Sequence, residues 1–354
     1  MNAEWSAFLQ QAGAVLTADR VSHFDQPESE LRAALDGNLR CDLSHWGLIA
    51  AADSDNESFL QGQLTCDVRQ VTLERSLIGA YCSPKGRALA SFRLFRRGGD
   101  LYLELPRELL ESTLARLRRY LLRAKATLTD ASDTQVGIGV AGPNAAARLT
   151  EILGKVPTAI NEVAQVGASE STSITLIRLP GSPPRFELHG AIREMQTVWE
   201  ALGTTFTPVG AEPWRLLDIL AGIPTVYPET VEAFVPQMLN LQLLEGISFQ
   251  KGCYTGQEVV ARTHYLGKLK RRMYLARVES PNPPQPGDPL FSPQTDVSQS
   301  AGRLVDAARH PDGGYAVLVA ALIECAEHGV LQLDDANGPT LQLQPLPYGF
   351  EARA

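Results

Sequence analysis

The sequence predicts a fold of the α+β class, and two patterns lead to this prediction. Strand-like runs alternate with helix-like runs over most of the chain and are joined in places by tight hairpins, which favours split β-α-β units over a doubly wound parallel sheet. After the segment 280–289, which holds five prolines in ten residues, short alternating runs predict a small antiparallel barrel or sandwich. A length of 354 residues predicts two to three domains.

The elements of the first part follow from periodicity and turn residues. A helix is expected from Pro106, because leucines at positions 110, 114, 117 and 121 recur along one face. Its arginines, at positions 116, 118, 119 and 123, are expected on a solvated face. Strands are expected at 45–51, 77–83, 87–95, 101–106, 127–131, 136–142, 173–179 and 185–190, and further helices at 54–64, 143–153 and 191–202.

The last part of the chain is expected to be β-structure. The run KLKRRMYLARV at 268–278 predicts one strand, and the segment 301–322 predicts two strands around the turn PDGG. No Gly-rich phosphate loop of either standard pattern follows any expected strand, so the sequence gives no sign of a nucleotide site.

Composition and charge exclude several classes of protein. The net charge of −8 leaves no general basic surface for nucleic acid. Residues 1–13 have no apolar core run, so we expect no signal peptide, and the longest apolar run, at 316–323, is too short to span a bilayer. We therefore expect a cytoplasmic protein, as a monomer, with no membrane segment and no direct contact with nucleic acid.

The five cysteines and six histidines show no metal-binding spacing. No C-x-x-C is present, which argues against a disulfide framework, a zinc site or a self-contained iron–sulfur cluster. No H-x-x-x-H or H-E-x-x-H is present either, and we predict no metal site.

The run SFQKGCYTGQEVVART at 248–263 contains the candidate functional thiol. Thr255 and Glu258 match a capping box, so a helix is expected from Gly256 and Cys253 would lie just outside its N-terminus. The helix dipole and Lys251 would then both lower the pKa of the thiol, with Lys251 acting as its activating residue. From the residues alone, a small buried thiol in a tight turn is an equally good interpretation.

The run KGCYTGQE at 251–258 resembles the signature of the YgfZ family of folate-binding proteins linked to tRNA modification. That family is related to the T-protein, the aminomethyltransferase of the glycine cleavage system. FLQGQLTCDV at 59–68, PKGRALASFRLF at 84–95 and the long run at 234–262 follow in the family's order.

The resemblance implies a fold and a set of domains. It implies a T-protein-like cloverleaf of split β-α-β (ferredoxin-like) domains with a C-terminal antiparallel β-barrel, around a channel for tetrahydrofolate. We place an N-terminal folate-binding domain at 1–130, a second α+β domain at 131–266 and the barrel at 267–354. An exchange of strands or helices is expected between the first two.

The resemblance also implies site residues. Trp46 and Trp214 fall where the family places aromatic walls of the folate site, although both could be core tryptophans. Lys85 and Arg262, together with Lys251, are candidates to meet the glutamate carboxylates of the folate. Exposed, solvated side chains are the alternative for each of these cations.

Two departures from the relatives affect the expected chemistry. Ala90 and Ser91 stand where the aminomethyltransferases carry carboxylates, so no residue for that chemistry is present there. Leu220 replaces a glutamate often found in the relatives, which removes a partner for the pterin.

Three functions remain open. The first is a folate-binding accessory protein that uses Cys253 and supports iron–sulfur cluster assembly or repair and iron–sulfur-dependent tRNA modification, with cluster-assembly proteins or tRNA-modifying enzymes as partners. The second is a tetrahydrofolate-dependent, aminomethyltransferase-like one-carbon enzyme, which Ala90 and Ser91 disfavour. The third is a thiol redox enzyme, which would need a second thiol from a partner.

Overall fold

The computed structural model describes residues 1–350 except 19, 168, 170–171, 268 and 296–299. Its contacts divide the chain into two compact units. Unit 1 comprises Met1–Leu60, Val68–Leu77 and Arg93–Leu217, and unit 2 comprises Gln61–Asp67, Ile78–Phe92 and Asp218–Ala354. The chain therefore enters each unit more than once. The division into three domains at 130/131 and 266/267 stays a prediction.

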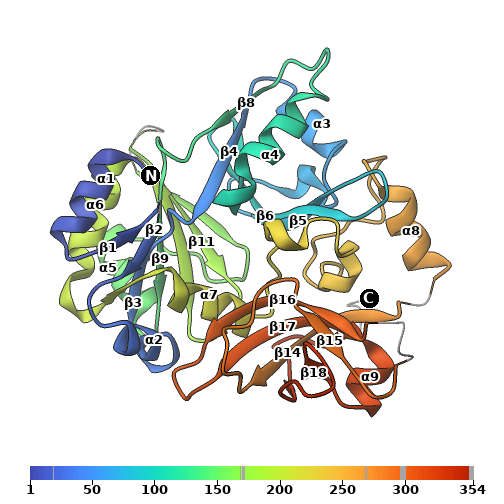
Figure 1. The fold of residues 1–354 in the computed structure, drawn as a ribbon. Coiled ribbons are helices and arrows are strands. Elements are labelled where there is room, and N and C mark those ends of the chain that lie inside the picture. The colour runs from blue at the N-terminus through green and yellow to red at the C-terminus, as the bar shows by residue number, and fades with distance from the viewer. Residues whose placement is uncertain (19, 168, 170–171, 268, 296–299, 351–354) are drawn as a thin grey trace. The chain divides into compact units, whose positions relative to one another are not determined.

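The first sheet of unit 1 has the strand order β10-β11-β12-β9-β3-β13. Figure 1 labels its strands β3, β9 and β11. Neighbouring strands are antiparallel except β13, which pairs in parallel with β3. The strands are β3 (Leu39–Asp42), β9 (Val136–Ala141), β10 (Val163–Val166), β11 (Ile174–Leu179), β12 (Arg185–Gly190) and β13 (Thr207–Val209). β3 thus joins a sheet whose other strands lie about 100 residues or more further along the chain.

One face of this sheet forms the main core of unit 1. Alternate side chains such as Ile138 and Leu188 pack under three helices, α1 (Ala3–Gln11), α5 (Ala145–Leu153) and α6 (Ile192–Leu202). Trp5 of α1 and Trp199 of α6 meet edge to face, with ring centroids 6.1 Å apart. The residues between these core positions face the other way and carry the polar groups described below.

The second sheet has the order β5-β6-β7-β4-β8. Its strands are β4 (Trp46–Ala52), β5 (Leu77–Cys82), β6 (Ala88–Arg97), β7 (Asp100–Pro106) and β8 (Thr127–Asp130), and the boundaries of the units fall within β5 and β6. These bounds confirm the expected strands to within a few residues.

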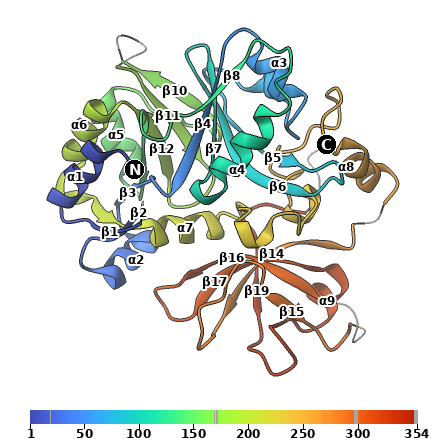
Figure 2. The same cartoon turned by 45° about the horizontal axis from the view of Figure 1, so that its top comes forward.

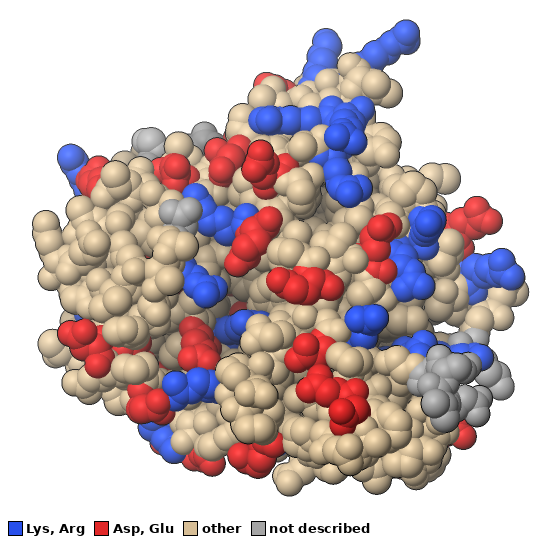
Figure 3. Space-filling view, viewed as in Figure 1, with Lys and Arg blue, Asp and Glu red and all other residues tan. Residues whose placement is uncertain are grey.

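Helix α4 (Arg107–Arg118) packs on β4, where a side chain at Gly47 would collide with Leu110. The helix ends at Arg118, so the predicted stripe was one turn too long and Leu121 lies beyond it. The arginines of this region, at positions 116, 118, 119 and 123, are exposed as expected, and Figure 3 shows basic side chains gathered over this end of unit 1.

Short elements complete unit 1. They are β1 (Val15–Thr17), β2 (Arg20–His23), α2 (Pro27–Asp36), α3 (Asn56–Gln61) and two 3₁₀ turns at Val68–Gln70 and Gly203–Thr205. Helix α7 (Ala211–Leu220) begins in unit 1, and its last residues belong to unit 2.

Unit 2 contains an antiparallel sheet with the order β18-β15-β16-β17-β14-β19. Figure 2 shows that this sheet curls into a half-barrel. The strands are β14 (Arg271–Val278), β15 (Pro289–Phe291), β16 (Gly302–Arg309), β17 (Tyr315–Leu322), β18 (Gln332–Leu333) and β19 (Gln342–Gln344). Tyr274, Leu304 and Val319 contribute to the core on one face, which the helix α9 (Ile323–His328) joins through Cys325. The predicted antiparallel C-terminal sheet is confirmed.

The remaining elements of unit 2 are helix α8 (Gln257–Tyr265) and two 3₁₀ turns at Pro228–Thr230 and Pro236–Leu239. Helix α8 begins one residue after the predicted start. Within the described part of the chain, no helix combines the length and the apolar character that a membrane crossing requires.

Candidate functional site

A buried polar layer lies on the second face of the first sheet in unit 1. Glu187 and His189 alternate along β12, so both point away from the helix-covered core. Glu104 of β7 meets them, and single ligand-type atoms of these three residues all lie within 4.8 Å of one another. All three side chains are buried, which concentrates two carboxylates and an imidazole in a region of low dielectric.

Arginines of β6 balance the charge of this cluster. Nε of Arg93 lies 3.3 Å from Oε2 of Glu187, and Arg97 donates a hydrogen bond to the carbonyl of His189. Nε2 of His189 lies 3.7 Å from Oε1 of Glu104. Burial first, and then the two guanidinium groups, lower the pKa of His189 to about 3. The imidazole is therefore neutral at neutral pH, and its Nε2 has no hydrogen-bond partner among the described residues.

The cluster has the ligand types of a divalent-metal site, but it lacks the net negative charge that such a site offers a cation. Two carboxylates and a histidine are common ligands of transition metals. Here a cation would approach two guanidinium groups and would compete with Arg93 for Glu187. The charges already cancel without a metal, so the geometry gives no reason to place one, and the absence of a metal site stays a prediction.

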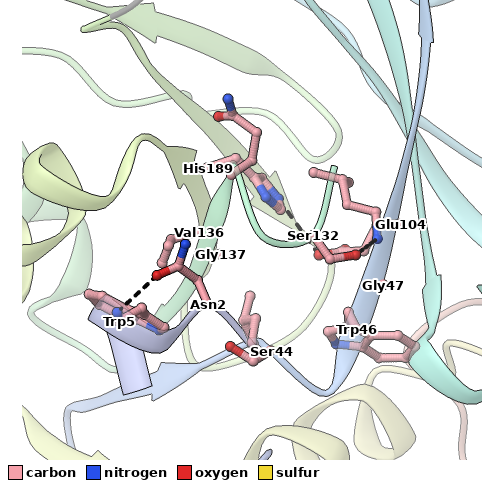
Figure 4. Close-up of a pocket in the computed structure, with 13 residues that line it drawn as sticks. Asn2, Trp5, Ser44, Trp46, Gly47, Glu104, Ser132, Val136, Gly137 and His189 are labelled. Carbon is pink, nitrogen blue, oxygen red and sulfur yellow. Dashed lines mark hydrogen bonds and ion pairs between the residues drawn. The ribbon is translucent and has the colours of Figure 1, made fainter. Parts of the chain in front are cut away.

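A small pocket opens beside the cluster (Figure 4). Its volume is about 20 Å³, and its lining includes Trp46, Glu104, His189 and Ser44. Trp46 is half-buried, and its indole N–H has no hydrogen-bond partner among the described residues. The space suits a water or the polar edge of a ligand rather than a whole fused ring. The predicted site residue Trp46 therefore offers an unused donor beside a carboxylate and a neutral imidazole.

A third buried carboxylate, Asp42, lies at the end of β3. It accepts hydrogen bonds from Nε1 of Trp5 at 2.7 Å and from Oγ of Ser44 at 2.8 Å. Burial raises the pKa of Asp42, and these donors act in the opposite direction. Since Trp5 and Ser44 also line the pocket, Asp42 holds two of its walls in place.

The other predicted tryptophan, Trp214 of α7, is fully buried in unit 1. Its ring lies against β9 at Gly139, where an added Cβ would come within 2.5 Å of it. The guanidinium of Arg185 lies 5.5 Å from the ring centroid. In this structure Trp214 is a core residue, and its role as a wall of a ligand site stays a prediction.

The K-G-C segment lies in unit 2, where Lys251 is buried. Its Nζ donates hydrogen bonds to the carbonyls of Leu64, at 2.7 Å, and Cys66, at 2.8 Å. The same ammonium lies 5.1 Å from the centroid of the Tyr254 ring. Lys251 therefore fastens residues 61–67 to the segment, which sequence reasoning did not foresee. Its predicted activation of Cys253 stays a prediction.

Cys253 is exposed, whereas the other four cysteines are buried. The alternative interpretation, that Cys253 is a small buried thiol in a tight turn, is therefore wrong. The predicted capping box is wrong: Gly256, with φ of 83°, is the N-cap residue of α8, and no side chain caps it. Gly256 packs closely on Ser83 and Gly86, so only glycine fits this turn.

Two predicted cations lie near this turn in the chain. Lys85 is exposed in the same turn as Gly86, and Gly86 touches Val259 of α8. Arg262 is exposed on α8. Both are open to solvent, and their contact with a ligand stays a prediction.

Two further thiols lie close to the segment. Burial raises the pKa of Cys66 and of Cys82 to about 12. Both lie near the hydroxyl of Tyr254, whose pKa burial also raises. These thiols stay protonated at neutral pH, which leaves Cys253 as the accessible sulfur.

Ala90 and Ser91, which stand where the aminomethyltransferases carry carboxylates, have structural roles here. Ala90 is fully buried in β6, and Oγ of Ser91 accepts a hydrogen bond from the backbone N–H of Val226 at 2.9 Å. Leu220 is half-buried at the end of α7. Ser91 thus serves the backbone rather than standing in for a catalytic acid.

A solved structure shares this architecture. The glycine cleavage system aminomethyltransferase T from Bartonella henselae aligns with a TM-score of 0.77 over 98% of this chain and 97% of its own, at 16% sequence identity. The chain has an aminomethyltransferase T-like fold. A heterotetrameric sarcosine oxidase from Corynebacterium sp. U-96 aligns over 51% of this chain and 90% of its own at 13% identity, with a TM-score of 0.36 that is too low to indicate a shared fold. No family model matches the sequence.

The comparison confirms the predicted relation in fold to the T-protein. The assignment to the YgfZ family and the cloverleaf arrangement stay predictions. Sequence reasoning missed Asp42, Glu104, Glu187 and His189. One signal was available for two of them: RFELHG at 185–190 places charged or polar side chains at every second position of an expected strand.

Proposed function

We propose that this protein binds a reduced folate and supports iron–sulfur cluster assembly or repair and iron–sulfur-dependent tRNA modification. The observation that carries the folate part is the aminomethyltransferase T-like fold over nearly the whole chain. The K-G-C-Y-T-G-Q-E run, which resembles the YgfZ signature, supports the accessory role. Partners would be cluster-assembly proteins or tRNA-modifying enzymes in the cytoplasm.

The side chains beside Trp46 suit the polar edge of a pterin. Such an edge carries both donors and acceptors, and the pocket offers the indole N–H of Trp46, the carboxylate of Glu104 and a neutral His189. The volume of about 20 Å³ admits only that edge. The ring itself would stack on the half-buried indole, as predicted for Trp46.

The exposed thiol supports a role that involves another molecule. Lys251, two residues before Cys253, fixes this segment through hydrogen bonds to two backbone carbonyls. The exposed sulfur of Cys253 therefore lies on an anchored turn. A buried structural cysteine would need no such presentation. A partner protein or a cluster sulfur is the expected target, with tetrahydrofolate as the bound cofactor.

The one-carbon transferase alternative is weaker. Aminomethyl transfer in the relatives relies on carboxylates at positions that read Ala90 and Ser91 here, and the hydroxyl of Ser91 is engaged by the backbone. A thiol redox enzyme would need a resolving thiol, and the nearby Cys66 and Cys82 are buried and protonated.

A complementation assay tests the proposed function. Cells that lack this protein would express either the parent chain or the Cys253→Ser variant, and iron–sulfur-dependent modified nucleosides in tRNA would be measured by mass spectrometry. We expect the parent to restore the modification and the variant to fail at equal abundance. Restoration by both chains, or a loss that follows a lower abundance of the variant, would contradict the role of the thiol.

A further inference from the structure

A cavity of about 190 Å³ lies within unit 2, beside the C-terminal sheet. Its lining includes three arginines, Arg87, Arg271 and Arg303, and three apolar residues, Phe234, Met238 and Ala320. The volume is roughly a dozen times the space that one water needs, so a small organic ligand fits.

The register of the sheet places two of the arginines on one face. Arg303 of β16 pairs with Ala320 of β17, and Ala320 pairs with Met273 of β14. Arg271 lies two residues before Met273 and therefore points to the same side. The opposite side carries the core residues Leu304, Val319 and Tyr274. The cavity thus lies on the face of the sheet opposite the cluster of Leu304, Val319 and Tyr274.

A backbone carbonyl holds each arginine in place. Arg87 donates to Ala233 at 2.9 Å, Arg271 to Ser300 at 2.8 Å and Arg303 to Gly287 at 3.0 Å. A guanidinium has five N–H groups, so these contacts leave donors for a ligand. None of the three forms an ion pair with a described residue.

The charge at this cavity is unusual for the chain. No carboxylate among the described residues lines it, although the chain carries a net charge of −8. Asp306 lies on the same face but bonds to the hydroxyl of Tyr227 and does not line the cavity. Three positive charges with no acid beside them among the described residues raise the local positive potential and favour an anion.

We propose that this cavity binds a small anion with two or more charged groups, carboxylates or phosphates. Planar guanidinium groups grip both kinds of oxyanion in a bidentate manner. Phe234, Met238 and Ala320 form an apolar wall that suits a short hydrocarbon spacer between charges. The carboxylate form rests on the proposed function, because γ-linked glutamyl groups of a folate carry such spacers.

Calorimetric titration of the full chain with two probes tests the site. One probe is tri-γ-glutamate, and the other is inorganic pyrophosphate. We expect at least one to bind, and we expect Arg271→Gln and Arg303→Gln each to weaken that binding about tenfold, the worth of one charged hydrogen bond. The affinity of Arg303→Lys should lie between those of the parent and Arg303→Gln, because lysine keeps the positive charge but cannot bind an oxyanion in a bidentate manner. Arg116→Gln, an exposed site in unit 1, makes the same change of net charge and should bind like the parent.

Each outcome decides the proposal. Binding of tri-γ-glutamate supports the site and its link to folate, whereas binding of pyrophosphate alone supports the site with phosphate as the ligand. If neither probe binds at millimolar concentration, or if the arginine variants bind like Arg116→Gln, the site does not exist. A tetrahydrofolate titration in parallel separates this failure from failure of folate binding itself.

Discussion

Nζ of Lys251 lies 2.8 Å from the carbonyl oxygen of Cys66, and both residues are buried. The lysine also binds the carbonyl of Leu64, so a single ammonium satisfies two backbone acceptors of residues 61–67. In the segment 251–258, Lys251 therefore has a structural role, whereas Cys253 is exposed and open to other molecules. The predictions below separate these two residues.

Lys251→Met should destabilise the fold. The substitution leaves two carbonyls without their charged donor, and we expect a loss of roughly 2–4 kcal/mol in the free energy of unfolding. Denaturant titration measures it. Lys85→Met, which removes the same charge from an exposed position in the same unit, should change stability by less than about 0.5 kcal/mol. Equal stabilities of the two variants would show that the carbonyl contacts contribute nothing.

The native protein should present one reactive thiol. Cys253 is exposed, and the other four cysteines are buried, so a chromogenic disulfide reagent should titrate one thiol in the folded chain and five after denaturation. Cys253→Ser should give none when folded and should unfold at nearly the same denaturant concentration as the parent. Two or more reactive thiols in the native parent would place another cysteine at the surface.

Acid should weaken the fold through His189. The pKa of this residue is lowered from 6.5 to about 3, so below pH 6.5 the unfolded state binds a proton that the folded state does not. Stability should therefore fall with decreasing pH, by up to about 1.4 kcal/mol per pH unit from this residue. His45, lowered to about 3 chiefly by burial, acts in the same direction.

The test compares the parent with His189→Gln between pH 6.5 and 5, where most carboxylates stay ionised. The free energy of unfolding of the variant should fall less steeply with decreasing pH, because the contribution of His189 is missing. His45 and Asp42, whose pKa values are also shifted, contribute equally in both proteins. Parallel pH profiles would mean that His189 takes up protons equally in the folded and unfolded states and would contradict its lowered pKa.

Aminomethyl transfer to tetrahydrofolate should be absent. The buried Ala90 and the hydrogen-bonded Ser91 supply no carboxylate at the positions that the transferases use. An assay with purified protein and an aminomethylated donor protein measures the turnover directly. A rate comparable with that of a true transferase would require another acid, and Glu104 would be the first to replace.

Sequence reasoning found the elements better than it found the site. The hairpin strands β6 and β7 and the antiparallel C-terminal strands follow from local patterns that the structure confirms, and α8 begins one residue after its expected start. The predicted capping box was wrong because Gly256, in a left-handed conformation, is the N-cap residue of α8 in place of Thr255. A sequence match cannot distinguish these two caps.

The buried polar cluster depends on pairing between distant segments. Arg93, Glu104 and Glu187 come from strands in two different sheets, and nothing local in the sequence specifies that they meet. The cavity with three arginines has the same origin, since Arg87 and Arg303 are more than 200 residues apart. Lys85, which the sequence resemblance gives as a candidate cation, lies two residues before Arg87 on the same hairpin.

Titration of the protein with tetrahydrofolate, followed by tryptophan fluorescence and calorimetry, tests the central claim most directly. We predict quenching and a micromolar dissociation constant, near −8 kcal/mol, because Leu220 replaces a polar partner. Trp46→Ala should weaken binding by about 1–3 kcal/mol, since the half-buried indole is the expected stacking surface. No heat and no quenching at millimolar folate would contradict the account, and unchanged affinity in Trp46→Ala would remove this residue from the site.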